Sequence, residues 1–388
     1  MRELTKKYCV GCGLCQALSK AELCVNEKGF SYPTSGDSEW LDSVCPIGNL
    51  PLEEYDSANI WGRYKSVFLG WSNNNKLRNQ ASSGGILSEV AIYLLKKGVV
   101  DGVIHIQADQ FDQAKNNTTI SCSAEEVLKK CGSRYSISHP LDILGNLDFT
   151  KKYAFIGRPC DVVALRNLQK VVPTIKQSIP LMLSFFCMGM PSDDAQEKLL
   201  SALGSTRDEC QKLTYRGNGW PGYAAVENRD GSKNQMDYDS SWGKILGRDL
   251  MPACRFCLDG IGEAADISCG DAWYMSEGGK PDFSEHEGRN VVFARTSAGE
   301  KILKAMLDEN RVTLEEVISL DEYLSKVQAS QFFRRASMGS RIAALCIMRK
   351  PYPKYSVDMM KEYSKRISAK EKVKVFLGTV KRIKKGVI

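Results

Sequence analysis

Cysteines are the residues whose spacing most clearly allows chemistry in this chain. Among its 388 residues are 14 cysteines, three of which form the run Cys9-Val-Gly-Cys12-Gly-Leu-Cys15. A C-x2-C-x2-C run places three thiolates around a [4Fe-4S] cluster, and a more distant Cys-Pro supplies the fourth. Cys45-Pro46 fits that fourth position. We therefore predict one [4Fe-4S] cluster on Cys9, Cys12, Cys15 and Cys45, with a four-cysteine zinc site as the alternative.

A second set of cysteines is predicted from strand ends. Cys254-Arg-Phe-Cys257 is compatible with zinc, a redox dithiol or an iron–sulfur cluster. Cys160 and Cys187 each follow an apolar strand, and the carboxyl ends of neighbouring parallel strands meet at one edge of a sheet. We expect these four thiols to hold a second cluster, preferring [4Fe-4S] over zinc. Cys269 could replace one of them.

The elements that must position these cysteines alternate between strand and helix. Such alternation is typical of α/β architecture with a largely parallel or mixed sheet. A capping box at Ser297-Ala-Gly-Glu300 opens one helix. The sequence predicts strands at 99–107, 153–157, 181–186 and 291–294, helices at 86–97, 161–169, 193–203 and 297–310, and a hairpin within 212–240.

Composition and charge exclude several classes of protein. Hydrophobic residues make up 43% and charged residues 26%, which is ordinary globular composition. The cysteine content is too low for a disulfide scaffold, and we find neither a secretory signal nor an apolar run long enough for a bilayer, so we expect a cytoplasmic protein. The net charge of +7 resides in residues 349–388, and the remainder is slightly acidic, so nucleic acid is not an expected partner.

The basic segment has the pattern of an amphipathic helix. Apolar residues recur at helical spacing from Val373 to Ile383 between lysines and arginines. Such a helix can lie on anionic lipid, here at the inner face of the membrane. It could equally pack on the body of the protein, or dock an acidic carrier such as ferredoxin.

Taken together, these motifs resemble the beta-subunit family of coenzyme F420 hydrogenases and dehydrogenases over roughly residues 5–340. Within that family, residues 157–166 look most like the branch with 7-hydroxymethyl chlorophyll a reductase and ferredoxin-dependent divinyl chlorophyllide reductase. The matching stretches are Cys9 to Cys15, 82–85, 132–135, 157–161, Phe186-Cys187, Cys254 to Cys257, 265–271 and Arg295-Thr296.

This resemblance implies FAD, one or two [4Fe-4S] clusters and electron transfer. It implies a mixed-sheet flavin-binding body preceded by a small ferredoxin-like iron–sulfur module. The second ferredoxin half-motif is absent, since Ser19-Lys20 stand in its place. We divide the chain into a module at 1–60, the two parts of the body at 61–150 and 151–345, and the basic tail at 346–388.

Three stretches are candidates for the flavin. Ser82-Ser83-Gly84-Gly85 precedes a helix, whose amide end favours a phosphate. Gly132-Ser133-Arg134-Tyr135 offers a turn, a cation and an aromatic face, and Arg295-Thr296 is a further anion-site candidate. Gly217 to Gly222 fits G-x-G-x-x-G in letters alone, because no helix is expected after it. The candidate proton donors are Asp271, Tyr135 and His286.

The leading hypothesis is an iron–sulfur flavoenzyme. Reduced ferredoxin or a similar carrier would supply electrons, and FAD would deliver a hydride to a small molecule or glycan precursor. One alternative is an electron-transfer subunit that exchanges hydride with deazaflavin F420 or NAD(P)H for a partner enzyme. Another is a zinc-stabilised binding protein without a redox role.

Overall fold

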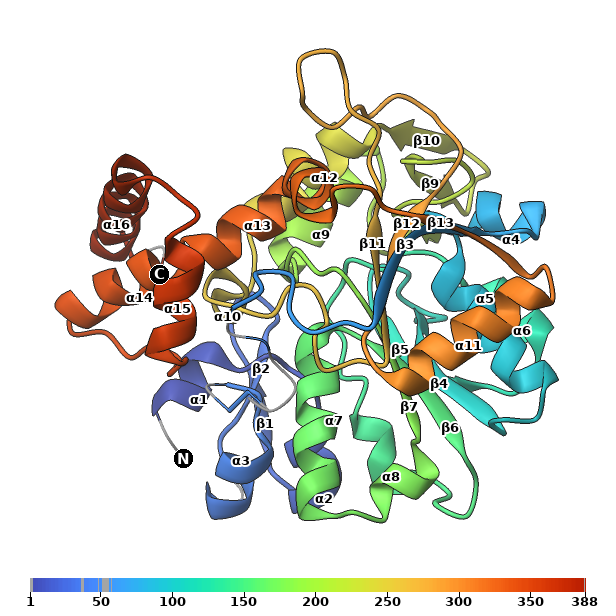
Figure 1. The fold of residues 1–388 in the computed structure, drawn as a ribbon, viewed down its shortest axis with the longest axis horizontal. Coiled ribbons are helices and arrows are strands. Elements are labelled where there is room, and N and C mark those ends of the chain that lie inside the picture. Colours follow the sequence, from blue (N-terminus) through green and yellow to red (C-terminus); the bar gives the residue numbers. More distant parts are fainter. Residues whose placement is uncertain (1–2, 36–37, 48, 51–55, 57, 387) are drawn as a thin grey trace.

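A large mixed sheet forms the centre of the fold (Figure 1). The computed structural model describes residues 3–386 and 388, except 36–37, 48, 51–55 and 57. The adjacent strands β11, β7, β6 and β4 are parallel, and antiparallel strands extend the sheet at both edges. The expected α/β architecture with a mixed sheet is confirmed. In spatial order the strands are β13 (Val312–Glu316), β3 (Ser66–Ser72), β12 (Asn290–Ala294), β11 (Ile267–Asp271), β7 (Leu181–Phe185), β6 (Tyr153–Gly157), β4 (Gly102–Ala108) and β5 (Asn116–Ser121).

Helices cover both faces of this sheet, which explains why its inner strands are apolar on both sides. On β6, Ala154 faces one core and Phe155 faces the other. The first core is completed by α5 (Ile86–Lys96), α6 (Ala124–Lys130) and α11 (Ser297–Asp308). The second is completed mainly by α7 (Pro159–Val171), which α8 (Ile175–Ser178) follows.

The amino-terminal residues form a small module that shares its core with the body. Leu14 and Val44 are buried in the same cluster as the apolar face of α7. Tyr8 packs edge-on against Phe256, with ring centroids 5.7 Å apart. The module therefore packs directly on the body and shares buried side chains with it. Its elements are α1 (Glu3–Tyr8), α2 (Leu14–Ser19), β1 (Leu23–Val25), β2 (Ser31–Pro33) and α3 (Ser38–Val44).

A second, smaller sheet lies beside the main one. The expected hairpin is confirmed by β9 (Ala224–Asn228) and β10 (Lys233–Met236), and β8 (Cys210–Thr214) pairs with β9. Helix α9 (Asp193–Ala202) shares a core with this sheet. The short helices nearby are α4 (Asn75–Gln80), η2 (Asp142–Asn146), η3 (Asp239–Gly243), η4 (Leu246–Arg248) and α10 (Pro252–Arg255).

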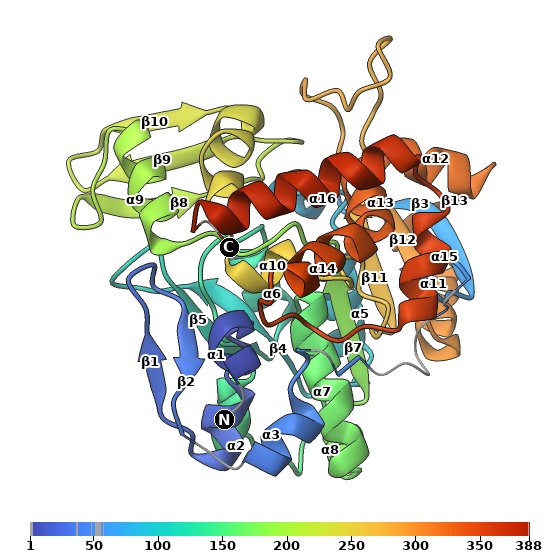
Figure 2. The same cartoon turned by 90° about the vertical axis from the view of Figure 1, so that its left-hand side faces the viewer.

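The basic carboxy-terminal segment packs on the body of the protein, which is one of the alternatives that its sequence left open. Tyr363 is fully buried, and its hydroxyl donates to the carbonyl of Asp56 at 3.0 Å. The helical spacing around Val373 is confirmed by α16, which packs on α14 with Ile383 buried (Figure 2). The helices of this region are α12 (Leu320–Val327), α13 (Ala329–Ala336), α14 (Met338–Ile347), α15 (Val357–Ser364) and α16 (Ala369–Lys384).

Two helix starts differ from expectation. Helix α7 begins at Pro159 rather than Asp161, because the Asp161 carboxylate reaches back to accept from the backbone N–H of Arg158 at 3.0 Å. Cys160 therefore lies inside the first turn. Helix α11 is capped by Thr296, whose hydroxyl accepts from Gly299 N–H at 3.2 Å, so the capping residue is not Ser297.

Candidate metal and cofactor sites

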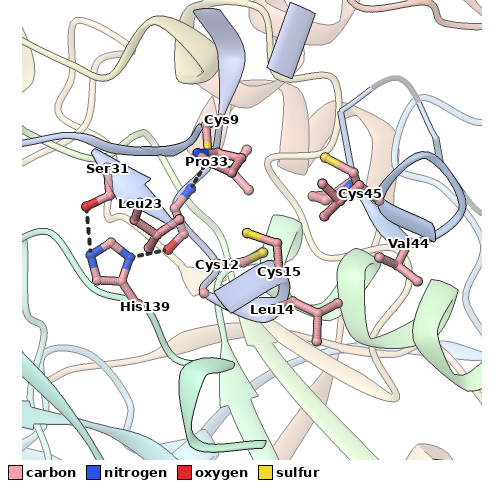
Figure 3. Close-up of a pocket in the computed structure, with 15 residues that line it drawn as sticks. Cys9, Cys12, Leu14, Cys15, Leu23, Ser31, Pro33, Val44, Cys45 and His139 are labelled. Carbon is pink, nitrogen blue, oxygen red and sulfur yellow. Dashed lines mark hydrogen bonds between the residues drawn. The ribbon is translucent and has the colours of Figure 1, made fainter. Parts of the chain in front are cut away.

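The first predicted set of cysteines lines one cavity in the amino-terminal module. Cys9 and Cys12 lie on the loop after α1, Cys15 lies on α2, and Cys45 follows α3 (Figure 3). Otherwise the wall is largely apolar. Glycine is required at Gly13, where φ is +86° and a Cβ would come within 2.9 Å of the Asp142 backbone nitrogen. The tight loop thus brings three thiols from a short segment to one cavity.

The environment of these thiols opposes their ionisation in the absence of a bound cation. Burial raises the pKa of Cys9 to about 12, and it raises the pKa of Cys12 well above the ordinary thiol value. The imidazole of His139 is held by the Gly11 carbonyl at 2.9 Å and the Ser31 hydroxyl at 3.3 Å. A positively charged metal centre would offset the cost of four thiolates here.

The second predicted set also comes together in the fold. Strands β6 and β7 are parallel neighbours, so Cys160 and Cys187 follow adjacent strand ends as expected. The Cys187 N–H donates to the Gly260 carbonyl at 2.8 Å, which ties β7 to the loop after Cys257. The Met190 N–H points at the sulfur of Cys254, 3.3 Å away.

Negative charge on one thiol of this second set raises the pKa of others in the set. Burial raises the pKa of Cys160, and charges on Cys187 and Cys257 add to this effect. Cys187 has a pKa raised to about 11 by burial and then by Cys254. For Cys269, burial raises the pKa and Arg295 is the charged group that opposes it. Cys269 lines a cavity that Cys187 also lines, and no thiol of the second set is among the groups that shift its pKa.

Arg158 connects the two cysteine sets. Its Nη2 donates to the Gly11 carbonyl at 3.4 Å, in the loop of the first set, and to the Ser138 carbonyl at 3.2 Å. Its Nε and Nη2 also donate to the Asp161 carboxylate at 2.8 and 2.7 Å, beside Cys160. The side chain is buried, and its charge lowers the pKa of thiols in both sets.

A third feature is a cavity of about 270 Å³ at the carboxyl ends of the parallel strands. Strand β4 contributes Ile106, β6 contributes Ile156, and β11 contributes Cys269 to its wall. The amino end of α5 opens onto it through Gly85, the helix cap with φ +78°. Cys187 also lines it, so the cavity adjoins the second cysteine set. This is the crevice in which open α/β sheets bind ligands.

Most of the predicted flavin-binding residues meet at this cavity, although they lie on separate loops. The two loops are joined by the Ser133 N–H, which donates to the Ser82 hydroxyl at 2.5 Å. Gly84 does not line the cavity. It packs against β3 instead, so closely that a Cβ on this residue would come within 2.7 Å of the Gly70 carbonyl oxygen. The predicted residues on its wall are Ser82, Ser83, Gly85, Gly132, Ser133, Arg134 and Tyr135.

Two predicted anion-binding arginines are engaged elsewhere. The buried Arg295 donates to the carbonyls of Trp61, at 2.6 Å, and Ile261, at 3.0 Å, while the Thr296 hydroxyl donates to Asp266 at 2.8 Å. Neither Arg295 nor Thr296 lines the cavity, and cofactor binding by these two residues stays a prediction. Arg134 lines the cavity, but its guanidinium donates to four acceptors on β5, β8 and the loop before β5.

The three candidate proton donors have different surroundings. Asp271 lines the cavity, but its carboxylate accepts from Arg216 at 2.9 and 3.1 Å and from Trp220 Nε1 at 2.9 Å. Tyr135 lines the same cavity, with its hydroxyl 3.4 Å from Arg216 Nη1. His286 lies on a loop away from the cavity and pairs with Asp282 at 2.8 Å.

Sequence reasoning missed several polar residues of the cavity wall, among them Lys130 and His105. The Nζ of Lys130 donates to the hydroxyls of Thr119, at 3.1 Å, and Ser121, at 3.2 Å. Burial, helped by the charge of Lys130, lowers the pKa of His105 to about 4, so its imidazole is neutral. Lys130 is two residues before Gly132, and this is the one signal that could have pointed to it.

Comparisons with known proteins give the family. Residues 67–145 match the amino-terminal part, and residues 150–319 the carboxy-terminal part, of the coenzyme F420 hydrogenase/dehydrogenase beta subunit. Coenzyme F420 hydrogenase subunit beta from Methanococcus voltae is 25% identical over 69% of this chain and 90% of that protein. The chloroplastic 7-hydroxymethyl chlorophyll a reductase of Oryza sativa subsp. japonica is 22% identical over 77% of this chain and 61% of that protein.

A solved structure supports the same relationship at the level of the fold. A chain of the F420-reducing [NiFe] hydrogenase complex from Methanosarcina barkeri superposes with a TM-score of 0.57 at 20% identity, covering 75% of this chain and 96% of that chain. By their names, the relatives are oxidoreductases or subunits of them. The protein belongs to the coenzyme F420 hydrogenase/dehydrogenase beta-subunit family.

Proposed function

We propose that this protein is an iron–sulfur flavoprotein oxidoreductase. Electrons from a reduced ferredoxin or a similar carrier would pass through two [4Fe-4S] clusters to FAD, and then as a hydride to a substrate. The clusters supply one-electron steps, and FAD turns two electrons and a proton into a hydride. The observation that carries this proposal is the arrangement of eight cysteines in two sets on either side of Arg158, the second beside the 270 Å³ cavity.

The donor chemistry of both sets suits clusters. Among the described residues, no three His, Cys, Asp or Glu side chains stand close enough to hold a single metal ion. A single zinc ion would draw four thiolates to about 2.3 Å from one centre. A cubane spaces its thiolates more widely, because each binds a different iron. The C-x2-C-x2-C run with a distant Cys-Pro is the spacing that ferredoxins use, so Cys9, Cys12, Cys15 and Cys45 on the wall of one cavity fit a cluster better than zinc.

The chain's own residues can hold a flavin diphosphate and stack on its ring. The amino end of α5 at Gly85 presents backbone amides, and Lys130 adds a cation to the same wall. Tyr135 and Trp242 line the cavity with their rings 4.7 Å apart. Among the three candidate acids, Tyr135 is the proposed proton donor. The Asp271 carboxylate instead fixes Arg216.

An anaerobic reduction experiment tests this function. The purified protein is mixed with reduced ferredoxin, and its visible spectrum is followed by stopped flow. We expect bleaching of the cluster absorbance followed by that of bound FAD. Tyr135→Phe should leave both phases intact, since the tyrosine acts on the substrate side of the flavin. Absence of bound flavin, or no reduction by ferredoxin or dithionite, would reject the proposal.

The Methanococcus voltae relative favours a second candidate function. It is named as a hydrogenase subunit, and the match with this chain spans 90% of its length. In that case the chain exchanges hydride with deazaflavin F420 or NAD(P)H and serves a partner enzyme. Direct bleaching of FAD by reduced F420 or NADPH, without any carrier protein, would favour this subunit role.

A further inference from the structure

A cluster of arginines lies on the carboxy-terminal side of the second cysteine set. Arg255 stands between Cys254 and Cys257 on the chain, and its carbonyl accepts from Arg341 Nη1 on α14 at 2.9 Å. Arg382 belongs to the last turn of α16, the helix that packs on α14. Figure 2 shows α16 lying along α14, and the charge of Arg382 acts on both Arg255 and Arg341. Three helices thus bring three cations together, which we call the arginine cluster.

The charges of the arginine cluster are only partly compensated within the described part of the chain, by Asp249 near Arg255. No carboxylate there forms a salt bridge with Arg255, Arg341 or Arg382. Asp249 lies near Arg255 but pairs with Lys28 at 2.7 Å. Burial and then the neighbouring arginines lower the pKa of Arg341 to about 10, and its buried Nε has no acceptor among the described residues. Such a surface favours an anionic partner.

Exposed cations extend this surface outward from the cysteines. Arg382 is exposed on α16, and so are Lys381, Lys384 and Lys385 around it. Deeper in the protein, Arg334 donates to the Cys187 carbonyl at 3.1 Å, and its charge acts on Arg341. Positively charged side chains therefore extend from the exposed end of α16 to the second cysteine set.

The apolar side of α16 favours a protein over a lipid as the occupant. Insertion into a bilayer requires a free apolar face. Here Ile383 is buried, and Phe376 and Val380 are half-buried against the body, which leaves Val373 and Leu377 exposed, at 56% and 57%. Two apolar side chains, one helical turn apart, give little area for insertion, whereas the basic side remains open.

We propose that the arginine cluster and the end of α16 form the docking surface for an acidic one-electron carrier protein. This proposal rests on the function proposed above and specifies where the electrons enter. Arg255 is next in sequence to Cys254, and Tyr8, next to Cys9, packs on Phe256 within the same loop. A carrier seated here lies close to the segments that hold both cysteine sets. Charge complementarity speeds such encounters and orients the partner.

Charge reversal on α16 tests the docking surface. The holoprotein is titrated with an acidic plant-type ferredoxin at low ionic strength, and Kd is measured by calorimetry. We expect Arg382→Glu to weaken binding by about five- to tenfold, and the difference to vanish near ~0.5 M salt. Lys370→Glu is the matched control, an exposed cation on the same helix about 18 Å away along its axis. Its Kd should stay within about twofold of the parent value.

Further measurements separate this proposal from its rivals. Iron and flavin contents of Arg382→Glu should equal those of the parent, since the exposed side chain is not a predicted ligand and lines neither cavity. Equal ferredoxin binding by the parent and Arg382→Glu would overturn the proposal. Tight binding to phosphatidylglycerol vesicles that Arg382→Glu abolishes, with no ferredoxin binding, would overturn it in favour of lipid. If dithionite reduces the bound cofactors but ferredoxin does not bind, docking fails and the proposed function stands. If ferredoxin binds as predicted to a chain without cofactors, the proposed function fails instead.

Discussion

Arg158 donates through Nη2 to the carbonyl of Gly11 at 3.4 Å, although 147 positions separate the two residues in the chain. The bond joins the loop of the first cysteine set to the first turn of α7, where Cys160 lies. The same guanidinium forms a buried ion pair with Asp161. One side chain therefore fixes the relative position of the two predicted cluster sites.

Removing this arginine should destabilise the protein, because the buried carboxylate of Asp161 loses the cation that it pairs with. We expect Arg158→Gln to lower the free energy of unfolding by about 3–5 kcal/mol, because Asp161 is left buried and unpaired. The double variant Arg158→Gln/Asp161→Asn should recover part of that loss. Denaturant unfolding measures both. Equal losses in the single and double variants would show that the stranded carboxylate is not the cause.

Cluster content should respond to individual cysteines. Cys160→Ser is expected to reduce bound iron from about eight to about four per chain, since one cluster loses a ligand. Cys269→Ser is the matched control, because Cys269 is a buried cysteine of β11, the strand beside β7, and is not one of the four predicted ligands. Iron retention in both variants would reject the second ligand set. Iron loss in Cys269→Ser alone would show that Cys269, and not Cys160, is the ligand.

Lys130 is expected to support flavin binding. Lys130→Met removes the cation from the cavity wall and should raise the Kd for FAD by about tenfold, equivalent to loss of one charge-assisted contact. Lys129→Met changes an exposed lysine one position earlier and should have no effect. Quenching of flavin fluorescence on titration of the flavin-depleted protein gives both constants. Matching values for the two variants would place the flavin diphosphate away from Lys130.

The sequence allowed prediction of the elements with simple patterns. The run 153–157 is uniformly apolar and forms β6 at the same bounds, and strands β6 and β7 deliver their cysteines to one sheet edge as expected. Edge strand β5 (Asn116–Ser121) has no such pattern, because its Asn and Thr residues are half-exposed, and it was not predicted. Local periodicity therefore located β12, β7, β6 and β4, but it missed β11 between β12 and β7 as well as the outer strands β13, β3 and β5.

The roles of the arginines could not be predicted in the same way. Arg295-Thr296 before a helix looks like an anion site, but Arg295 is satisfied by carbonyls from residues 61, 63 and 261. Those acceptors are brought together by tertiary contacts and leave no trace near Arg295 in the sequence. For the same reason, the apolar spacing of α16 predicted the helix but not the surface that it covers.

Deletion of the carboxy-terminal segment tests that packing. A chain ending at Arg349 loses the Tyr355 hydroxyl, which donates to the Phe256 carbonyl at 2.7 Å inside the C-x2-C loop, and the buried Tyr363. We expect a lower Tm and loss of about half of the bound iron. Tyr355→Phe should cost about 1 kcal/mol by itself. An unchanged Tm and iron content after truncation would show that the segment is dispensable for the fold.

The neutral state of His105 predicts a pH dependence of stability. Its folded pKa of about 4 lies below the unfolded value, so the unfolded chain binds more protons between these values. Stability is therefore lost as pH falls from about 6.5 toward 4. His105→Gln, which keeps a partner for the Ser121 hydroxyl, should reduce the fall in Tm over this range. Parallel Tm curves for parent and variant would contradict the assignment.

The central claim is tested most directly by counting cofactors in protein purified without oxygen. Iron, acid-labile sulfide, zinc and flavin are measured per chain on the same sample. The account predicts about eight iron, about eight sulfide and one FAD, corresponding to two [4Fe-4S] clusters and one flavin. About four iron would contradict the two-site arrangement, and a colourless protein with zinc and no flavin would contradict the redox function as a whole.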